Sequence, residues 1–236
     1  MIPNLEKIVE GSVLVFNKPY GWTSFDLVKK VRNTIRKASG LKKIKVGHAG
    51  TLDPLATGVL VICTGKKTKI IEEIQNREKE YTGSFFLGAT TPSFDLETEI
   101  DNRFPTDHLT EEIIKQATQK FIGVIDQTPP IFSAVKIQGK RAYEYAREGK
   151  EVKIESKKVE IKKFVIEKIN LPEVDFRVIC SKGTYIRSLA RDFGNEINSG
   201  AHLVSLCRTR VGEYKIEESI DINKFFLMSN RITHKQ

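Results

Sequence analysis

The residues that could do chemistry are concentrated in one stretch, Gly47–Gly58 (GHAGTLDPLATG). Three glycines and one proline in twelve residues indicate a loop of defined shape. Pro54 disfavours helical geometry at Asp53, so we expect this carboxylate in an extended segment, directly before a continuous apolar run. A carboxylate held there can act as a nucleophile or a general base. A turn aspartate that bonds its own backbone has the same signature, so this stretch alone leaves both interpretations open.

No other stretch has the spacing of a cofactor or metal site. Gly65-Lys66-Lys67-Thr68 resembles part of a phosphate-binding loop, but the Gly-x-x-x-x-Gly-Lys-Ser/Thr order is absent. The four histidines are dispersed, and Cys63, Cys180 and Cys207 include no Cys-x-x-Cys pair. We therefore expect no metal site of the usual spacing. The odd number of cysteines in apolar contexts predicts buried thiols in a reducing cytoplasm rather than a disulfide framework.

The positive charge of the chain is concentrated in two segments. The 236 residues include 39 Lys and Arg against 30 Asp and Glu, a net charge of +9. Residues 29–45 hold eight basic residues and no acidic one, and residues 136–163 hold ten basic and five acidic residues. Such concentration favours a polyanionic partner such as nucleic acid, although a solvated surface remains the alternative. No run of 18 apolar residues exists and residues 1–11 lack the pattern of a secretory signal, so we expect no membrane partner.

Apolar periodicity indicates the elements that must position these groups, and it predicts one α/β domain over residues 1–236. Strands are expected at 13–16, 59–63, 81–87 and 202–208, with two antiparallel strands within 158–181. One helix is expected after Thr23 or Ser24 and as far as Gly40, because Phe25, Val28, Val31 and Ile35 recur at helical spacing. Three further helices are expected at 70–74, from Thr110 to Phe121, and at 186–197. Residues 123–157 have a poor core pattern and predict a projecting excursion.

The string around Asp53 closely resembles the catalytic motif of the pseudouridine synthases, in particular the bacterial tRNA pseudouridine-55 synthase family, where it reads GHTGTLDPLATGVL. Only Ala49, in place of Thr, departs from that motif. Five further motifs resemble the family in the same order along the chain: Asn17-Lys18-Pro19, Lys79-Glu80-Tyr81, Ser133–Lys136 with Gly139–Tyr143, Cys180–Leu189, and Gly200–Leu203.

The resemblance implies a fold and a reaction. The fold is the pseudouridine synthase fold, a mixed, mainly antiparallel sheet flanked by helices. The reaction converts uridine to pseudouridine at position 55 in the T-loop of tRNA, without a cofactor and after extrusion of the base from its stack. Asp53 matches the essential aspartate that starts cleavage of the N1–C1′ bond. Whether it attacks C1′, attacks C6 or leads to a glycal stays open.

The resemblance also implies roles for seven other residues. Tyr81 matches a tyrosine that packs on the target uracil, and Arg187 matches an arginine that pairs with the catalytic carboxylate and keeps it ionised. His48 matches the histidine that fills the space left by the flipped base. The remaining matches are pocket-lining Tyr185 and Leu206, and Lys18 and Lys182 as supports of the loop or the RNA. Without the motif matches, Tyr81 would more readily be explained as an aromatic residue of an amphipathic strand, and core packing is the alternative for Tyr185 and Leu206.

The resemblance further implies that residues 127–152 are an RNA-binding, thumb-like insertion, which would grip the T-arm of tRNA with the basic segment 29–45. It extends to about Phe226, so we expect a short form that lacks the C-terminal RNA-binding (PUA) domain of longer relatives, and a cytoplasmic monomer. Two other hypotheses are a pseudouridine synthase for another RNA site and a non-catalytic RNA-binding or RNA-folding protein. The presence of Asp53, Tyr81 and Arg187 argues against the second of these.

Overall fold

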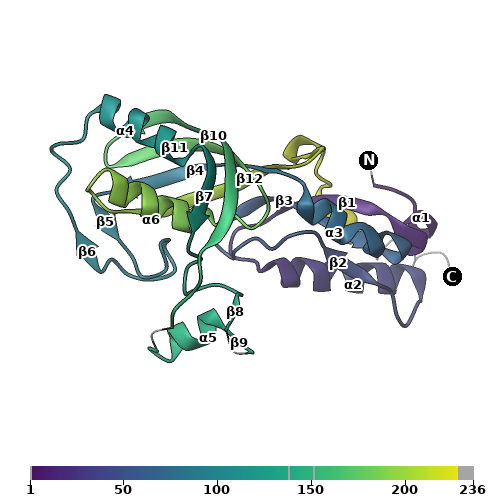
Figure 1. The fold of residues 1–236 in the computed structure, drawn as a ribbon. Coiled ribbons are helices and arrows are strands. Elements are labelled where there is room, and N and C mark those ends of the chain that lie inside the picture. The colour runs from purple at the N-terminus through teal and green to yellow at the C-terminus, as the bar shows by residue number, and fades with distance from the viewer. Residues whose placement is uncertain (1, 138, 151, 228–236) are drawn as a thin grey trace. The chain divides into compact units, whose positions relative to one another are not determined.

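The computed structural model describes residues 2–137, 139–150 and 152–227, and the chain divides into two compact units. The first unit comprises residues 1–81 and 207–236, and the second comprises residues 82–206. Two strands, β4 (Lys79–Leu87) and β12 (Ala201–Val211), continue from one unit into the other (Figure 1). The sequence did not indicate this division. The single catalytic domain expected over residues 1–236 stays a prediction.

In the first unit the sheet is organised around the expected apolar strand. β1 (Val13–Lys18) pairs antiparallel with β3 (Thr57–Thr64), so that Val13 lies opposite Cys63 and Lys18 opposite Gly58. β2 (Val46–His48) also pairs antiparallel with β3, and the end of β12 pairs parallel with it. β13 (Tyr214–Lys215) pairs with β12. The strands predicted at 13–16 and 59–63 are thus confirmed, and each extends by a few residues.

Helix α2 (Ser24–Ser39) begins and ends where the sequence predicted. Thr23 and Asp26 form a reciprocal capping box, and Gly40 ends the helix with φ 71°. The buried side chains of Leu27, Val28, Val31, Ile35 and Ala38 form its inner face. The expectation that Phe25 belongs to this face is wrong, because its side chain is 61% exposed. Successive residues advance about 100° around a helix, which places Phe25 on the flank of that face.

Two cores lie on opposite faces of the β1–β3 pair. Alternate side chains such as Leu14, Phe16, Leu60 and Ile62 pack with α2 on one face, and Val15, Val59 and Val61 pack with Ile74 on the other. The other helices of this unit are α1 (Leu5–Gly11), η1 (Gly65–Ile70), α3 (Ile71–Asn76), η3 (Ile216–Glu218) and α7 (Ile222–Leu227). This arrangement fixes β3, and therefore the loop that precedes it.

The second unit is a sheet with one apolar face. Its strands lie in the order β12, β4, β11 (Glu173–Cys180), β10 (Lys157–Asn170) and β7 (Gly123–Gln127), and β10 pairs antiparallel with both of its neighbours. Five phenylalanines from the strands and helices pack together: Phe85, Phe121, Phe164, Phe176 and Phe193. They hold α6 (Ile186–Glu196) and the α4–η2 segment (Glu111–Phe121) on the same face. A short pair, β5 (Ala89–Thr90) and β6 (Asn102–Arg103), completes this unit.

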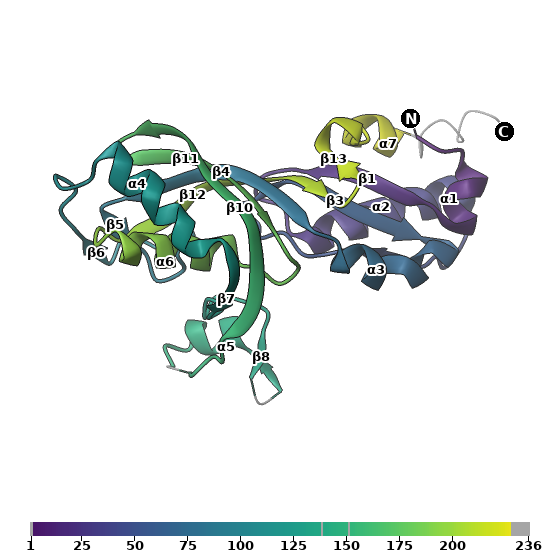
Figure 2. The same cartoon turned by 45° about the horizontal axis from the view of Figure 1, so that its top comes forward.

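The projecting excursion exists, but its bounds differ from those expected. Residues 123–127 form β7 and Lys157 begins β10, so residues 128–156 connect two paired strands. The sequence placed residues 123–127 in the excursion because they have no buried pattern. They form an edge strand in which only Gln127 is fully buried and Val124 is 66% exposed. The excursion carries β8 (Lys136–Ile137), β9 (Lys140–Arg141) and α5 (Ala142–Arg147), and it stands away from the sheet of its unit (Figure 2).

The expected class, a mixed and mainly antiparallel α/β fold, is confirmed. The three cysteines are free thiols, as expected, although Cys207 is half-buried rather than buried. Among the described residues no helix is long and apolar enough to cross a membrane. The fold therefore places the Asp53 loop in the first unit and the motif around Arg187 in the second.

Candidate active site

Asp53 lies in the loop between β2 and β3, and its half-buried carboxylate is carried by a tightly fixed backbone. The Leu52 amide donates to Ser24 Oγ at 2.8 Å, and the same hydroxyl donates back to the Leu52 carbonyl at 3.0 Å. Ala56 N donates to the Asp53 carbonyl at 3.1 Å and closes a turn. The loop is therefore pinned to the first residue of α2, immediately before the carboxylate.

Arg208 holds the other side of this loop from β12. Its side chain is 1% exposed and donates to three carbonyls: from Nε to Val59 at 2.8 Å, from Nη2 to Gly50 at 3.0 Å and from Nη1 to Thr51 at 3.3 Å. Gly58 lets β12 approach, because a Cβ built on it would lie 2.3 Å from the Arg208 carbonyl oxygen. Its φ of 103° is a further reason for glycine.

Lys18 is buried beneath the same loop, where its ammonium binds main-chain carbonyls. It donates to Trp22 at 2.5 Å, to Pro19 at 2.9 Å and to Pro54 at 3.2 Å. Burial lowers the pKa of Lys18 to about 8, and the Asp53 carboxylate opposes that shift. The structure thus brings together two of the residues expected from the sequence, Lys18 and Asp53.

His48 and Tyr81 also belong to the first unit. His48 ends β2 opposite Ile62, and its half-buried ring has an Nδ1 without a hydrogen-bond partner among the described residues. Burial lowers the pKa of His48, and the positive charge of Arg208 adds to that effect, while a backbone hydrogen bond at Gly50 opposes it. The neutral form of His48 is therefore favoured. Tyr81 lies on β4 with a side chain that is 8% exposed.

In the second unit, Arg187 lies in the first turn of α6 and is buried with a carboxylate. Its guanidinium Nε is 3.6 Å from Asp95 Oδ2, and both side chains are less than one tenth exposed. Nη1 also donates to the Ser93 carbonyl at 3.4 Å. A buried guanidinium needs such partners because an unpaired charge in a low-dielectric interior is strongly disfavoured. Asp95 therefore fixes Arg187 within this unit.

The residue between Ser93 and Asp95 adopts an unusual backbone conformation. Phe94 has φ 63°, the left-handed region that bulky residues avoid. Its carbonyl accepts from Leu203 N at 2.9 Å, and the Arg191 guanidinium lies 4.9 Å from the centre of its ring. Strain of this kind persists where the surroundings over-determine it. The conformation directs both Ser93 O and the Asp95 side chain towards Arg187.

The other expected residues of the second unit lie near the start of α6 or on β12. Tyr185 precedes α6 and is half-buried, while Lys182 is exposed in the turn before it and Leu206 is half-buried on β12. The buried Gln127 side chain accepts from Tyr185 N at 2.7 Å and donates to Tyr185 O at 3.2 Å. The end of β7 thus fixes the backbone at which α6 begins.

Sequence reasoning missed four residues that hold the expected ones: Ser24, Asp95, Gln127 and Arg208. Arg208 had a detectable signal, since an arginine at the end of an apolar strand needs buried acceptors. Asp95 and Gln127 gave none, because their partners are 92 and 58 positions away in the chain. Long-range pairing of this kind has no periodicity in the sequence.

The chemistry available in this loop is that of a carboxylate. Among the described residues, no group of three or more His, Cys, Asp and Glu side chains could hold a metal ion. Asp53 is carried by a loop fixed from α2, β1 and β12, so its carboxylate needs little reorganisation to act as nucleophile or base.

Comparison with known proteins gives consistent results. Residues 36–186 match the model of the TruB family pseudouridylate synthase N-terminal domain. A tRNA pseudouridine synthase B of Flavobacterium johnsoniae is 58% identical, over 93% of this chain and 96% of its own length. The protein of the same name from Phocaeicola vulgatus is 57% identical, over 92% of each chain.

Solved structures support the fold. A chain in an H/ACA RNP bound to a substrate RNA containing 2′-deoxyuridine is 26% identical with a TM-score of 0.69, and a chain in a Cbf5–Nop10–Gar1 complex is 27% identical with a TM-score of 0.68. These alignments cover 100% and 96% of this chain, which spans 59% and 61% of those chains. The expected pseudouridine synthase fold is therefore confirmed.

Proposed function

The chain belongs to the TruB family of pseudouridylate synthases, and we propose that it converts uridine 55 in the T-loop of tRNA to pseudouridine. Pseudouridine synthases are isomerases, so this chain is an isomerase that modifies RNA. In the reaction the N1–C1′ bond of the uridine breaks, the uracil rotates, and a C5–C1′ bond forms, with the C5 proton transferred to solvent and N1 protonated. The base composition of the RNA is otherwise unchanged.

Asp53 is the catalytic carboxylate in this proposal. The observation that carries it is the way the loop is held: Ser24, Lys18 and Arg208 all bind its main chain, from three different elements. An aspartate with only a structural role in a turn would not need three buried side chains to fix the main chain of its loop.

The other roles follow the family motifs. Tyr81 packs on the target uracil, Arg187 stabilises the catalytic carboxylate, and His48 occupies the space of the extruded base. A neutral, half-buried imidazole suits that last role, because it can fill an apolar space between bases without desolvating a charge. Tyr185 and Leu206 line the uracil pocket, and Lys18 and Lys182 support the loop and the RNA.

The T-arm is the part of tRNA that this chain grips. The excursion 128–156 and the basic segment 29–45 supply contacts to its phosphates, and tRNA as substrate follows from the names of the close relatives. A monomeric state and a cytoplasmic location belong to the same proposal. The free thiols at Cys63, Cys180 and Cys207 suit a reducing compartment.

The experiment is pseudouridine mapping on an unmodified tRNA transcript, with the Asp53→Asn variant beside the parent protein. We expect pseudouridine at position 55 with the parent and none with Asp53→Asn, while tRNA affinity stays within a factor of about three, since the amide keeps the shape of the side chain. Asp107→Asn makes the same chemical change in an exposed loop and serves as the control. Turnover by Asp53→Asn would remove Asp53 from the chemistry. Pseudouridine at another uridine would refute position 55.

A further inference from the structure

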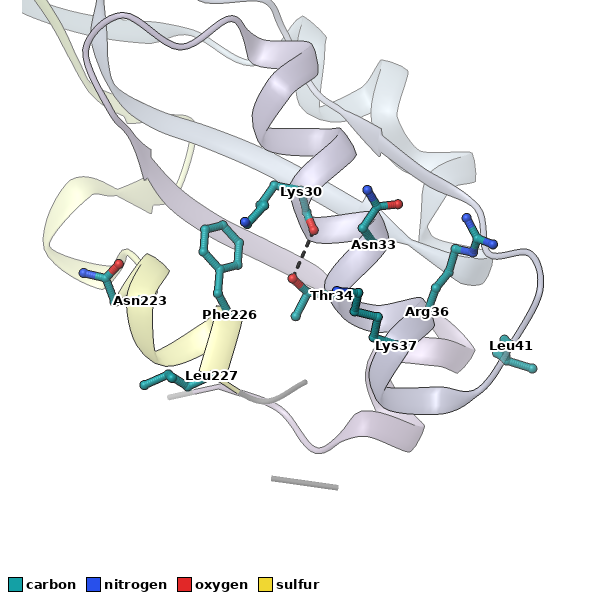
Figure 3. A pocket seen from close by; sticks show the side chains of 9 residues that line it. All are labelled: Lys30, Asn33, Thr34, Arg36, Lys37, Leu41, Asn223, Phe226 and Leu227. Carbon is teal, nitrogen blue, oxygen red and sulfur yellow. Dashed lines mark hydrogen bonds between the residues drawn. The ribbon is translucent and has the colours of Figure 1, made fainter. Parts of the chain in front are cut away.

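A large hollow lies between α2 and α7 in the first unit, and none of the described residues of the Asp53 loop lines it (Figure 3). Its volume is about 740 Å³, within the range of small-molecule sites. Helix α2 and the segment after it contribute most of the lining and α7 the rest: Lys30, Asn33, Thr34, Arg36, Lys37 and Leu41, then Asn223, Phe226 and Leu227. Of the residues that line it, those of the basic segment 29–45 have a role above only as contacts to tRNA phosphates, and Asn223, Phe226 and Leu227 have none.

The charge of the lining selects an anion. Lys30, Arg36 and Lys37 are exposed on α2, and no acidic side chain is among the described residues that line the hollow. These three cations belong to the basic segment 29–45 but occupy one wall of a concave surface rather than a convex helix face. Phosphate groups entering this hollow would meet several positive charges at once.

An aromatic ring lies in the same hollow. Phe226 is half-buried, and its neighbour Phe225 is fully buried against Phe16 at 5.2 Å, which anchors the helix that carries both. Lys30 Nζ lies 5.3 Å from the centre of the Phe226 ring. A base stacked on this ring would bring its phosphate close to Lys30. Asn33 and Asn223 add exposed amides that can donate to and accept from base edges.

A second, smaller hollow continues along α2. Its volume is about 330 Å³, and it shares Lys30 and Asn33 with the first and adds Trp22, Asp26 and Lys29. Asp26 is engaged in the cap of α2, where it accepts from the Thr23 amide at 3.0 Å. Cations of α2 therefore line the two hollows together with two aromatic rings, Trp22 before the helix and Phe226 on α7, and proteins bind single-stranded nucleic acid with this combination.

We propose that this hollow binds an unpaired nucleotide segment of the bound tRNA, with a base on Phe226 and phosphates on Arg36 and Lys37. This inference rests on the proposed tRNA substrate, but it concerns a second contact remote from the reacting uridine.

The test uses the full-length protein and a short oligoadenylate, which contains no uridine and so cannot be a substrate. Trp22 is the one tryptophan of the chain and lines the adjoining hollow, so quenching of its fluorescence reports binding. We expect Phe226→Leu to weaken oligoadenylate binding about tenfold without changing its salt dependence. We expect Arg36→Gln with Lys37→Gln to flatten the slope of log affinity against log salt by about 1.4.

Lys67→Gln with Lys69→Gln is the matched control, since it removes the same charge from exposed positions on η1. An equal loss of slope in this control would show diffuse electrostatic binding and overturn the inference. Equally tight quenching by adenosine monophosphate would indicate a free-nucleotide site and would also overturn it. The proposed reaction is tested separately. Pseudouridine formation by the Asp53→Asn variant would contradict that reaction mechanism, and it would not change the fluorescence quenching by oligoadenylate.

Discussion

In the first unit, the loop that carries Asp53 is held by side chains that donate to its main-chain carbonyls, whereas in the second unit Arg187 is held through its own guanidinium. Lys18 and Arg208 bind carbonyls at Pro54, Gly50 and Thr51, and the Asp95 carboxylate lies beside Arg187. The first arrangement fixes the backbone that carries the Asp53 side chain. The second fixes the Arg187 guanidinium directly, through the neighbouring charge of Asp95.

This difference predicts different failures. Removing a cation from the first unit leaves carbonyls unpaired, which costs about 1–3 kcal/mol for each buried group. Removing the Asp95 carboxylate from the second unit takes a countercharge from the buried Arg187 guanidinium, which costs about 3–5 kcal/mol. In the first unit, a variant that removes such a cation should lower both stability and activity, because it loosens the loop that carries Asp53. In the second unit, a variant that removes the carboxylate should lower both, because it changes the charge beside Arg187.

The largest effect is expected for Asp95→Asn. The amide keeps the acceptor for Glu97 N, which donates to Asp95 Oδ1 at 3.0 Å, so the variant removes the charge with little change of shape. We expect a loss of about 3 kcal/mol in the free energy of unfolding, measured by urea denaturation. Glu97→Gln, an exposed carboxylate two positions away, should change stability by less than about 0.5 kcal/mol. Equal stability of the two variants would mean that Asp95 does not compensate Arg187.

Arg187→Lys keeps the charge but not the planar guanidinium. We expect the single-turnover rate of pseudouridine formation to fall roughly 100-fold, which is about 2.7 kcal/mol of transition-state stabilisation. Arg191→Lys, one turn later on α6 and part-exposed, should cost much less. A rate within threefold of the parent for Arg187→Lys would contradict the need for a guanidinium at this position.

Arg208→Lys tests the carbonyl-binding arrangement of the first unit. A lysine cannot reach Val59, Gly50 and Thr51 together, so at least one buried carbonyl loses its donor. We expect about 2 kcal/mol less stability and roughly tenfold slower turnover, because the Asp53 loop is no longer fixed. The control is Arg210→Lys, two positions along β12, whose part-exposed partner is Glu78. A comparable effect at Arg210 would show that general strand stability, not the loop, is responsible.

The smallest effect concerns pH. The pKa of Lys18 is lowered by burial to about 8, so in this window the unfolded chain binds more protons at this site than the folded chain does. Stability contributed by Lys18 should therefore rise by about 1 kcal/mol as the pH increases from about 8 to about 9, since a pH unit between the folded and unfolded pKa values is worth at most about 1.4 kcal/mol. The comparison of the parent with Lys18→Met by urea denaturation at pH 7, 8, 9 and 10 isolates this term. If the stability of the parent relative to Lys18→Met fell as the pH rose, the direction of the pKa shift of Lys18 would be the opposite of the one stated here.

Much of the local structure could be predicted. The capping box at Thr23, the apolar run of β3 and the alternation in β10 and β11 are local patterns, and each produced the expected element. Two errors had a physical cause: Phe25 lies beside the inner face of its helix, and β7 is an edge strand whose exposed Val124 resembles a loop. Exposure at a flank or an edge depends on neighbours that a local pattern does not contain.

The sequence by itself determined that Asp53 is the residue to test, since a carboxylate in that motif leaves few alternatives, and that the chain belongs with the pseudouridine synthases. Only the tertiary structure decided what holds the chemistry in place. Arg208 reaches Gly50 across 158 positions, and Asp95 reaches Arg187 across 92. It also decided that Arg36, Lys37 and Phe226 share one hollow. The reason is that burial and pairing depend on proximity in space, whereas a sequence pattern records only proximity along the chain.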